Sequence, residues 1–179
     1  MAKNVITTLE KLDGATVTHS VNSQCLRCLV TAGETTVQVE VKVDRSCKVA
    51  VLSTATLSRL YNQSPRVINV MAYDVALAHK LGAWYERRLV RDLFDVYLFL
   101  CMGIKPDNET LTERLRNPRF SKSTVSGRNL RELESFLGFF KDQALRLSYQ
   151  DILDELGPIL PKAELPGPQL SGRKVAVML

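Results

Sequence analysis

The sequence predicts an α+β protein, with a small, mostly antiparallel sheet and one helix followed by an all-helical C-terminal lobe. Two patterns predict this fold. In Thr36–Asp44, apolar and polar residues alternate at the strand period of two. From Asn69 onward, apolar residues recur every three or four positions, which is the helical period. The composition, 45% apolar and 24% charged, is typical of a globular chain and excludes disorder of the whole chain.

The β-rich part should begin with a short amphipathic helix over Val5–Leu12, which Asp13-Gly14 ends. Four strands are expected to follow, with Gly33 in the turn between the second and third. These strands are Ala15–His19, Cys25–Thr31, Thr35–Val43 and Lys48–Leu52. In the third strand one face should be apolar and point to the core, and the other should be polar. The apolar face is Val37, Val39, Val41 and Val43, and the polar face is Gln38, Glu40, Lys42 and Asp44.

The helical part should contain five helices. They are Ala72–Glu86, Arg91–Met102, Asp107–Arg116, a long helix from Ser126 or Gly127 to Leu147, and Asp151–Leu156. Gly103 should end the second helix, and Ser148 should form a capping box with Asp151 at the start of the last. The chain is therefore expected to have a β-rich lobe over residues 1–70, a helical domain over 71–160 and a flexible, Pro- and Gly-rich tail over 161–179.

Several classes of protein are disfavoured by simple counts. The longest apolar run, Val96–Met102, is far shorter than the roughly 20 residues that span a bilayer. The first residues lack the pattern of a secretory signal. We therefore expect a cytoplasmic protein without a membrane partner. The net charge of +5 over 179 residues is only weak support for nucleic-acid binding.

The Cys25-Leu26-Arg27-Cys28 motif could belong to a zinc site or be two ordinary thiols. A structural zinc site needs four ligands, and the chain has no second motif of this kind and only two histidines. The segment also has the pattern of a strand, where residues three apart point to opposite faces. Buried or half-buried reduced thiols are therefore the favoured interpretation of Cys25 and Cys28.

The segment most informative about chemistry is Lys80–Asp95. On a helix, Lys80, Ala83 and Arg87 share one face, and Asp92 and Asp95 lie one turn apart on the next helix. A bland interpretation is an exposed helical corner whose ion pairs each contribute less than about 1 kcal/mol.

The spacing is more specific than that. The pattern Lys-Leu-x-Ala-x3-Arg-x3-Arg-Asp-Leu-[aromatic]-Asp, which begins at Lys80 and ends at Asp95, resembles the signature of the AbiEii-type nucleotidyltransferase toxins. These toxins are a MenT-related branch of the polymerase-β-like nucleotidyltransferase superfamily. Upstream, Val37-Gln38-Val39-Glu40-Val41 resembles a strand of that family. The resemblance implies a partial nucleotidyltransferase lobe in the β-rich part, and a role in a toxin–antitoxin or phage-defence (abortive infection) system.

The resemblance also implies roles for individual residues. Lys80, Asp92 and Asp95 correspond to catalytic positions, and Lys80, Arg87 and Arg91 to positions that contact nucleotide phosphates. Glu40 corresponds to the third carboxylate that holds two Mg²⁺ ions, although it could equally be a solvated strand residue with a partner across the sheet. The implied partners are an NTP, a tRNA or other RNA acceptor, and an antitoxin protein.

The chain departs from the family pattern in one respect. It contains no Gly-Gly or Gly-Ser pair and no Asp-x-Asp, which in the family cradle the phosphates and hold both metals. We therefore expect a member lacking its first third, in which Mg²⁺ binds only when an upstream chain supplies these motifs. Two alternatives remain: a catalytically inactive module that binds a partner, and a basic protein that binds nucleic-acid phosphates.

Overall fold

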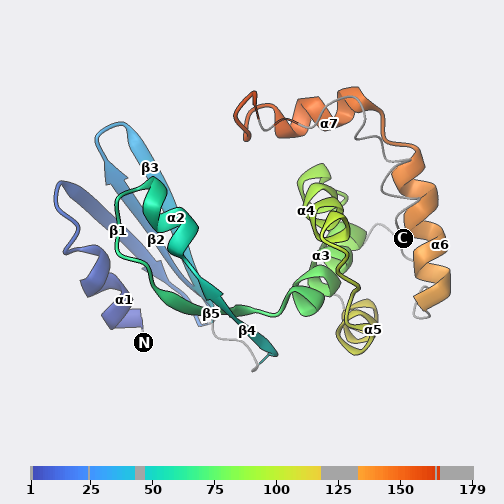
Figure 1. The fold of residues 1–179 in the computed structure, drawn as a ribbon, viewed down its shortest axis with the longest axis horizontal. Coiled ribbons are helices and arrows are strands. Elements are labelled where there is room, and N and C mark those ends of the chain that lie inside the picture. Colours follow the sequence, from blue (N-terminus) through green and yellow to red (C-terminus); the bar gives the residue numbers. More distant parts are fainter. Residues whose placement is uncertain (1, 24, 43–46, 118–132, 164, 166–179) are drawn as a thin grey trace. The chain divides into compact units, whose positions relative to one another are not determined.

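A computed structural model describes residues 2–23, 25–42, 47–117, 133–163 and 165 of the chain (Figure 1). Contacts divide the chain into two compact units, Met1–Ser46 and Cys47–Leu179. The fold is α+β, as predicted, with a three-stranded antiparallel sheet in the first unit, and a two-stranded antiparallel sheet and helices in the second. The domain boundaries expected near residues 70 and 160 stay a prediction.

The first unit consists of helix α1 (Ala2–Leu9) and strands β1 (Ala15–Val21), β2 (Cys25–Ala32) and β3 (Thr35–Lys42). The strands pair in the order β1-β2-β3. Gly33, in the two-residue turn between β2 and β3, has a φ of 57°, which glycine adopts without steric cost. Helix α1 contacts β1 and β2, and Leu26 and Cys28 of β2 are buried in this unit.

Two details of the first unit correct the sequence prediction. The helix begins at Ala2 and ends at Leu9, three residues earlier than expected at both ends. After Leu9 the chain tightens into turns, in which the Leu12 amide donates to the Leu9 carbonyl, and the Leu12 side chain is half exposed. In β3, Val37 is 54% exposed and does not face a core, whereas Val39 and Val41 are half-buried. Val43 and Asp44 lie outside the described residues.

The second unit begins with strands β4 (Val49–Ser53) and β5 (Val67–Met71), which pair antiparallel, and helix α2 (Ala55–Leu60) between them. The sequence prediction contained β4 within one residue at each end but neither α2 nor β5. The β5 sequence, Val-Ile-Asn-Val-Met, carries a recognisable strand signal because β-branched and apolar residues dominate it. Thr54 fixes the start of α2 through two hydrogen bonds of 2.8 Å to Arg66. Its hydroxyl oxygen accepts from the Arg66 amide, and its own amide donates to the Arg66 carbonyl.

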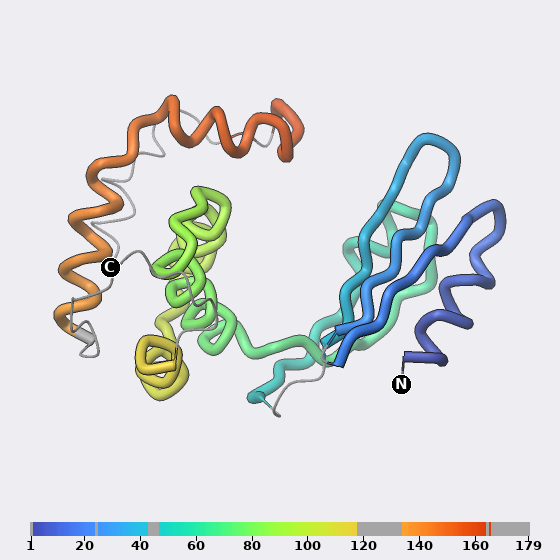
Figure 2. The backbone as a smooth tube through the Cα atoms, turned by 180° about the vertical axis from the view of Figure 1, so that it is seen from behind, coloured from blue at the N-terminus to red at the C-terminus, as the bar shows by residue number. Residues whose placement is uncertain are grey.

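The remaining elements of the second unit are helices. They are α3 (Tyr73–Arg87), α4 (Val90–Cys101), α5 (Asn108–Arg116), α6 (Leu133–Leu145) and α7 (Tyr149–Leu156). Helix α3 contacts both α4 and α5, and α7 contacts α4. Figure 2 gives a second view in which α3 and α4 lie side by side. The core around α3 is aromatic: Trp84 is 2% exposed, and its ring centroid lies 4.4 Å from that of Phe140.

The predicted bounds of the helices that correspond to α3, α4, α5 and α7 are confirmed to within two residues. Gly103 follows α4 with a φ of 72°, and the Ser148–Asp151 capping box is formed at α7. The long helix is described only from residue 133. Its expected start, and nearly all of the expected tail over 161–179, lie outside the described residues.

The four cysteines form no disulfide, and Cys25 is half-buried and Cys28 fully buried, as expected, while the choice between ordinary thiols and a zinc site stays a prediction. In the described parts of the chain, no helix is long and apolar enough to cross a membrane.

Candidate functional site

The candidate site lies at the corner between α3 and α4. Helix α3 stops at Arg87 because Arg88 adopts a left-handed backbone conformation with a φ of 59°. This conformation costs a non-glycine residue about 1–2 kcal/mol. The Arg88 guanidinium lies over the rings of Trp84, Tyr85 and Phe139, at 4.5, 5.5 and 4.4 Å from their centroids, and these contacts help to offset the cost.

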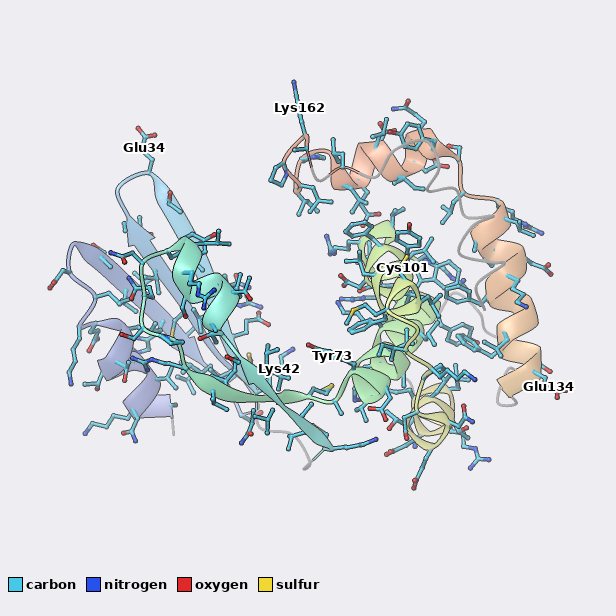
Figure 3. All side chains as sticks on the ribbon, in the orientation of Figure 1. Glu34, Lys42, Tyr73, Cys101, Glu134 and Lys162 are labelled. Carbon is cyan, nitrogen blue, oxygen red and sulfur yellow. The ribbon has the colours of Figure 1, made fainter. Side chains whose placement is uncertain are left out.

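The corner brings together two side chains from the shared face of α3, Lys80 and Arg87, and two from α4, Asp92 and Asp95. The Lys80 ammonium lies 2.5 Å from Asp95 Oδ2 and 3.7 Å from Asp92 Oδ1. Arg87 Nη2 donates to both carboxylate oxygens of Asp92, at 2.6 and 2.7 Å. Figure 3 marks the start of α3 with Tyr73 and the end of α4 with Cys101, the two helices that carry this cluster.

Burial separates the two carboxylates of the cluster, whereas the cations Arg87 and Lys80 are 33% and 39% exposed. The Asp92 side chain is only 1% exposed, so its charge must be compensated inside the protein, and Arg87 does this. Lys80 and Asp95 are 39% and 38% exposed and form the outer pair. The four residues are two cations and two carboxylates, so the cluster has no net formal charge. We call these four residues the corner cluster.

Arg91, the remaining predicted phosphate contact, is exposed and belongs to neither pair. Its backbone amide and that of Val90 donate to the Glu155 carboxylate, at 3.3 and 2.8 Å. The residue before α4 is Leu89, whose side chain cannot cap a helix. A carboxylate from α7 therefore caps α4 and fixes the first turn, on which Asp92 lies.

Glu40 belongs to the other unit, on β3. Its carboxylate accepts from Arg27 Nε at 2.9 Å and Gln38 Nε2 at 3.1 Å, and Arg27 Nη2 lies 2.8 Å away. Arg27 is its direct neighbour across the β2–β3 ladder. The structure thus shows the cross-strand pairing expected of a solvated strand residue, while a metal-binding role for Glu40 stays a prediction.

The described residues do not fit a two-magnesium site. Asp92 has both oxygens bonded to Arg87, Asp95 is bonded to Lys80, and Glu40 is bonded to Arg27. Within the described ranges there is also no group of three His, Cys, Asp or Glu residues that could hold an ion. Two bridging metals require several carboxylates with free oxygens, so any such pair of ions needs ligands beyond these.

Sequence reasoning missed a buried ion pair beneath the corner. Arg114 Nη2 of α5 lies 2.8 Å from Glu86 Oε1 of α3, and both residues are buried. Gly82 makes room for it, because a Cβ at Gly82 would meet Arg114 Cβ and Nε at 3.2 Å. The signal was present in the sequence: Glu86 follows the apolar run Ala83-Trp84-Tyr85, a position where an unpaired carboxylate would be costly.

The corner cluster is formed by the Lys80–Asp95 segment, whose sequence pattern resembles that of the AbiEii-type nucleotidyltransferase toxins. The family described as Nucleotidyl transferase AbiEii toxin, Type IV TA system, matches residues 3–170. The match covers most of the chain, and the chain belongs to this family. No curated protein and no solved structure gives a significant match.

Proposed function

We propose that this chain is a nucleotidyltransferase-related component of a type IV toxin–antitoxin system that transfers NMP from an NTP only when a second polypeptide completes its site. The observation that carries the proposal is the corner cluster: the family pattern from Lys80 to Asp95 folds into one connected set of charged groups.

Lys80 is the group best suited to bind the nucleotide. Its ammonium is 39% exposed, and a lysine on a flexible stem is a compact point charge that binds phosphate readily. One nitrogen of Arg87 already donates to both oxygens of Asp92. Arg91 is the second proposed phosphate contact, and its exposure on the first turn of α4 supports this role.

The proposal assigns two family motifs to the second polypeptide. Backbone amides of a glycine loop and the carboxylates of an Asp-x-Asp are absent from the 179 residues. Mg²⁺ would supply Lewis-acid stabilisation of the phosphates in a completed site, and the family resemblance makes Glu40 a candidate ligand. An RNA such as tRNA is the proposed acceptor, and an antitoxin protein is the proposed regulatory partner.

The test is reconstitution. The purified chain is mixed with a polypeptide that carries the glycine loop and Asp-x-Asp of this family, then incubated with Mg²⁺, radiolabelled NTP and total tRNA. We expect labelled RNA from the mixture, and loss of the label with Lys80→Ala. A mixture that binds tightly but labels neither RNA nor protein would contradict the proposal.

One observation favours a second candidate, an inactive module that binds a partner such as an antitoxin. Each carboxylate of the proposed site already accepts from a cation of its own unit, as expected for a site kept for structure rather than chemistry. The third candidate, a basic nucleic-acid-binding surface, is disfavoured because the Arg88 guanidinium lies over aromatic rings. A steep dependence of RNA binding on salt would identify that third candidate.

A further inference from the structure

We propose that Asp95 is a resting counter-ion of Lys80, one that leaves the ammonium group when a polyphosphate binds there and so sets the affinity of the site. The inference rests on the proposed function only in taking the polyphosphate to be that of a nucleotide. It concerns regulation of the corner cluster by one of its own residues.

The two carboxylates of the cluster differ in what holds them. Asp92 is 1% exposed, and both of its carboxylate oxygens are bonded to Arg87. Breaking these bonds would leave a buried charge uncompensated. Asp95 is 38% exposed and lies 2.5 Å from Lys80, which is itself 39% exposed. Water can therefore solvate Asp95 as soon as its ion pair opens, and an exposed pair of this kind contributes little free energy.

Lys80 can exchange partners without leaving the cluster. Its ammonium has three donors and lies 3.7 Å from Asp92 Oδ1 in addition to Asp95. When the bond to Asp95 opens, the buried Asp92 still attracts Lys80 and keeps the ammonium at the corner. Arg87 is then a positioning residue, because it fixes the Asp92 carboxylate towards which Lys80 is drawn.

A polyphosphate and Asp95 cannot both use Lys80 without conflict. Both are anions, and they would lie within a few ångströms of each other at a partly exposed site, where repulsion weakens binding. Asp95 thus lowers the affinity for polyphosphate by two routes: it occupies the cation, and it repels the ligand. Removing its charge should strengthen binding, which is the opposite of what is expected if Asp95 is a binding or purely structural residue.

The test is the affinity of the full chain for sodium tripolyphosphate, without magnesium, by calorimetry at low salt. Asp95→Asn should raise the affinity about three- to tenfold, the range for one unscreened charge near a partly exposed cation. Asp95→Ser should give the same gain, and the double variant Lys80→Gln/Asp95→Asn should lose it. The matched control is Asp142→Asn, which removes an equal charge from the exposed surface of α6 and should change affinity less than about twofold.

The proposal is wrong if Asp95→Asn and Asp95→Ser leave the affinity unchanged or lower it, if Asp142→Asn gives an equal gain, or if neither the natural chain nor the two Asp95 variants bind at millimolar concentration. It is also wrong if the gain survives Lys80→Gln. These outcomes are independent of the reconstitution described above, because tripolyphosphate binding needs neither a second polypeptide nor transfer. Reconstitution can fail while Asp95→Asn still tightens binding, and the reverse can also occur.

Discussion

Replacing Arg87 by methionine should destabilise the second unit strongly, because it leaves the Asp92 carboxylate without its principal cation. Asp92 is 1% exposed, and the two bonds from Arg87 Nη2 are 2.6 and 2.7 Å long. Leaving a buried charge without its partner costs about 3–5 kcal/mol, and the 33% exposure of Arg87 favours the lower end of this range. Lys80 remains 3.7 Å from Asp92 Oδ1 and compensates part of the charge, so we expect a loss of about 3 kcal/mol.

Urea unfolding followed by Trp84 fluorescence measures this loss. Trp84 is the only tryptophan of the chain and is 2% exposed in the core around α3, so its emission reports the unfolding of the second unit. With a slope of about 2 kcal/mol per molar urea, the unfolding midpoint of Arg87→Met should fall by about 1.5 M. Arg91→Met is the matched control, since Arg91 is exposed on the neighbouring helix, and its effect should stay within about 0.5 kcal/mol.

A double variant separates charge compensation from simple packing. Arg87→Met/Asp92→Asn removes both charges, and it should recover most of the stability lost in Arg87→Met, because a neutral amide is far cheaper to bury than a carboxylate. A loss below about 1 kcal/mol in Arg87→Met, or no recovery in the double variant, would refute the assignment of Arg87 as the counter-ion of a buried Asp92.

Three further changes have expected outcomes in the same unfolding assay. Glu155→Ala should cost about 1–2 kcal/mol because it removes the cap of α4, and no loss would mean that water replaces the carboxylate fully. Gly82→Ala should cost about 1–2 kcal/mol despite the better helix propensity of alanine, because its Cβ would press on the buried Arg114; a gain in stability would contradict the close approach. The side-chain hydrogen bond from Lys48 lowers the pKa of Asp74 below its ordinary value of 3.8. The pair therefore stabilises the fold above pH 3.8, and this stabilisation is lost as the pH falls through the lowered pKa. Lys48→Met should make the loss of stability at acid pH shallower, and an unchanged pH profile would contradict this.

The corner cluster could be predicted from sequence because it depends on local geometry. Lys80 and Arg87 share a face through the helical period alone, and the Arg88–Val90 corner returns the chain so that Asp92 meets them. The helix stops at Gly103 and the capping box at Ser148 depend likewise on a few neighbouring residues.

The contacts that sequence reasoning missed join positions far apart in the chain. Glu155 caps a helix that begins 65 residues before it, and Arg114 pairs with Glu86 across two helices. The local sequence around Glu155 or Arg114 does not predict which residue it contacts. Glu155 meets the start of α4 only because α7 packs on α4, and Arg114 meets Glu86 only because α5 packs on α3. The wrong prediction that Val37 faces the core has a related cause. Strand alternation predicts which residues share a face, but not whether another element covers that face.

We propose above that the chain provides a phosphate-binding corner and does not transfer nucleotides by itself. The most direct measurement is incubation of the purified 179-residue chain alone with Mg²⁺, radiolabelled NTP and tRNA. We predict no labelling of RNA or protein above the background of Lys80→Ala, because the carboxylates of the corner cluster are bonded to cations and no Asp-x-Asp is present to hold two ions about 3.5–4 Å apart. Robust labelling by the chain alone that Lys80→Ala abolishes would contradict the claim, and would show that other carboxylates of this chain complete the site.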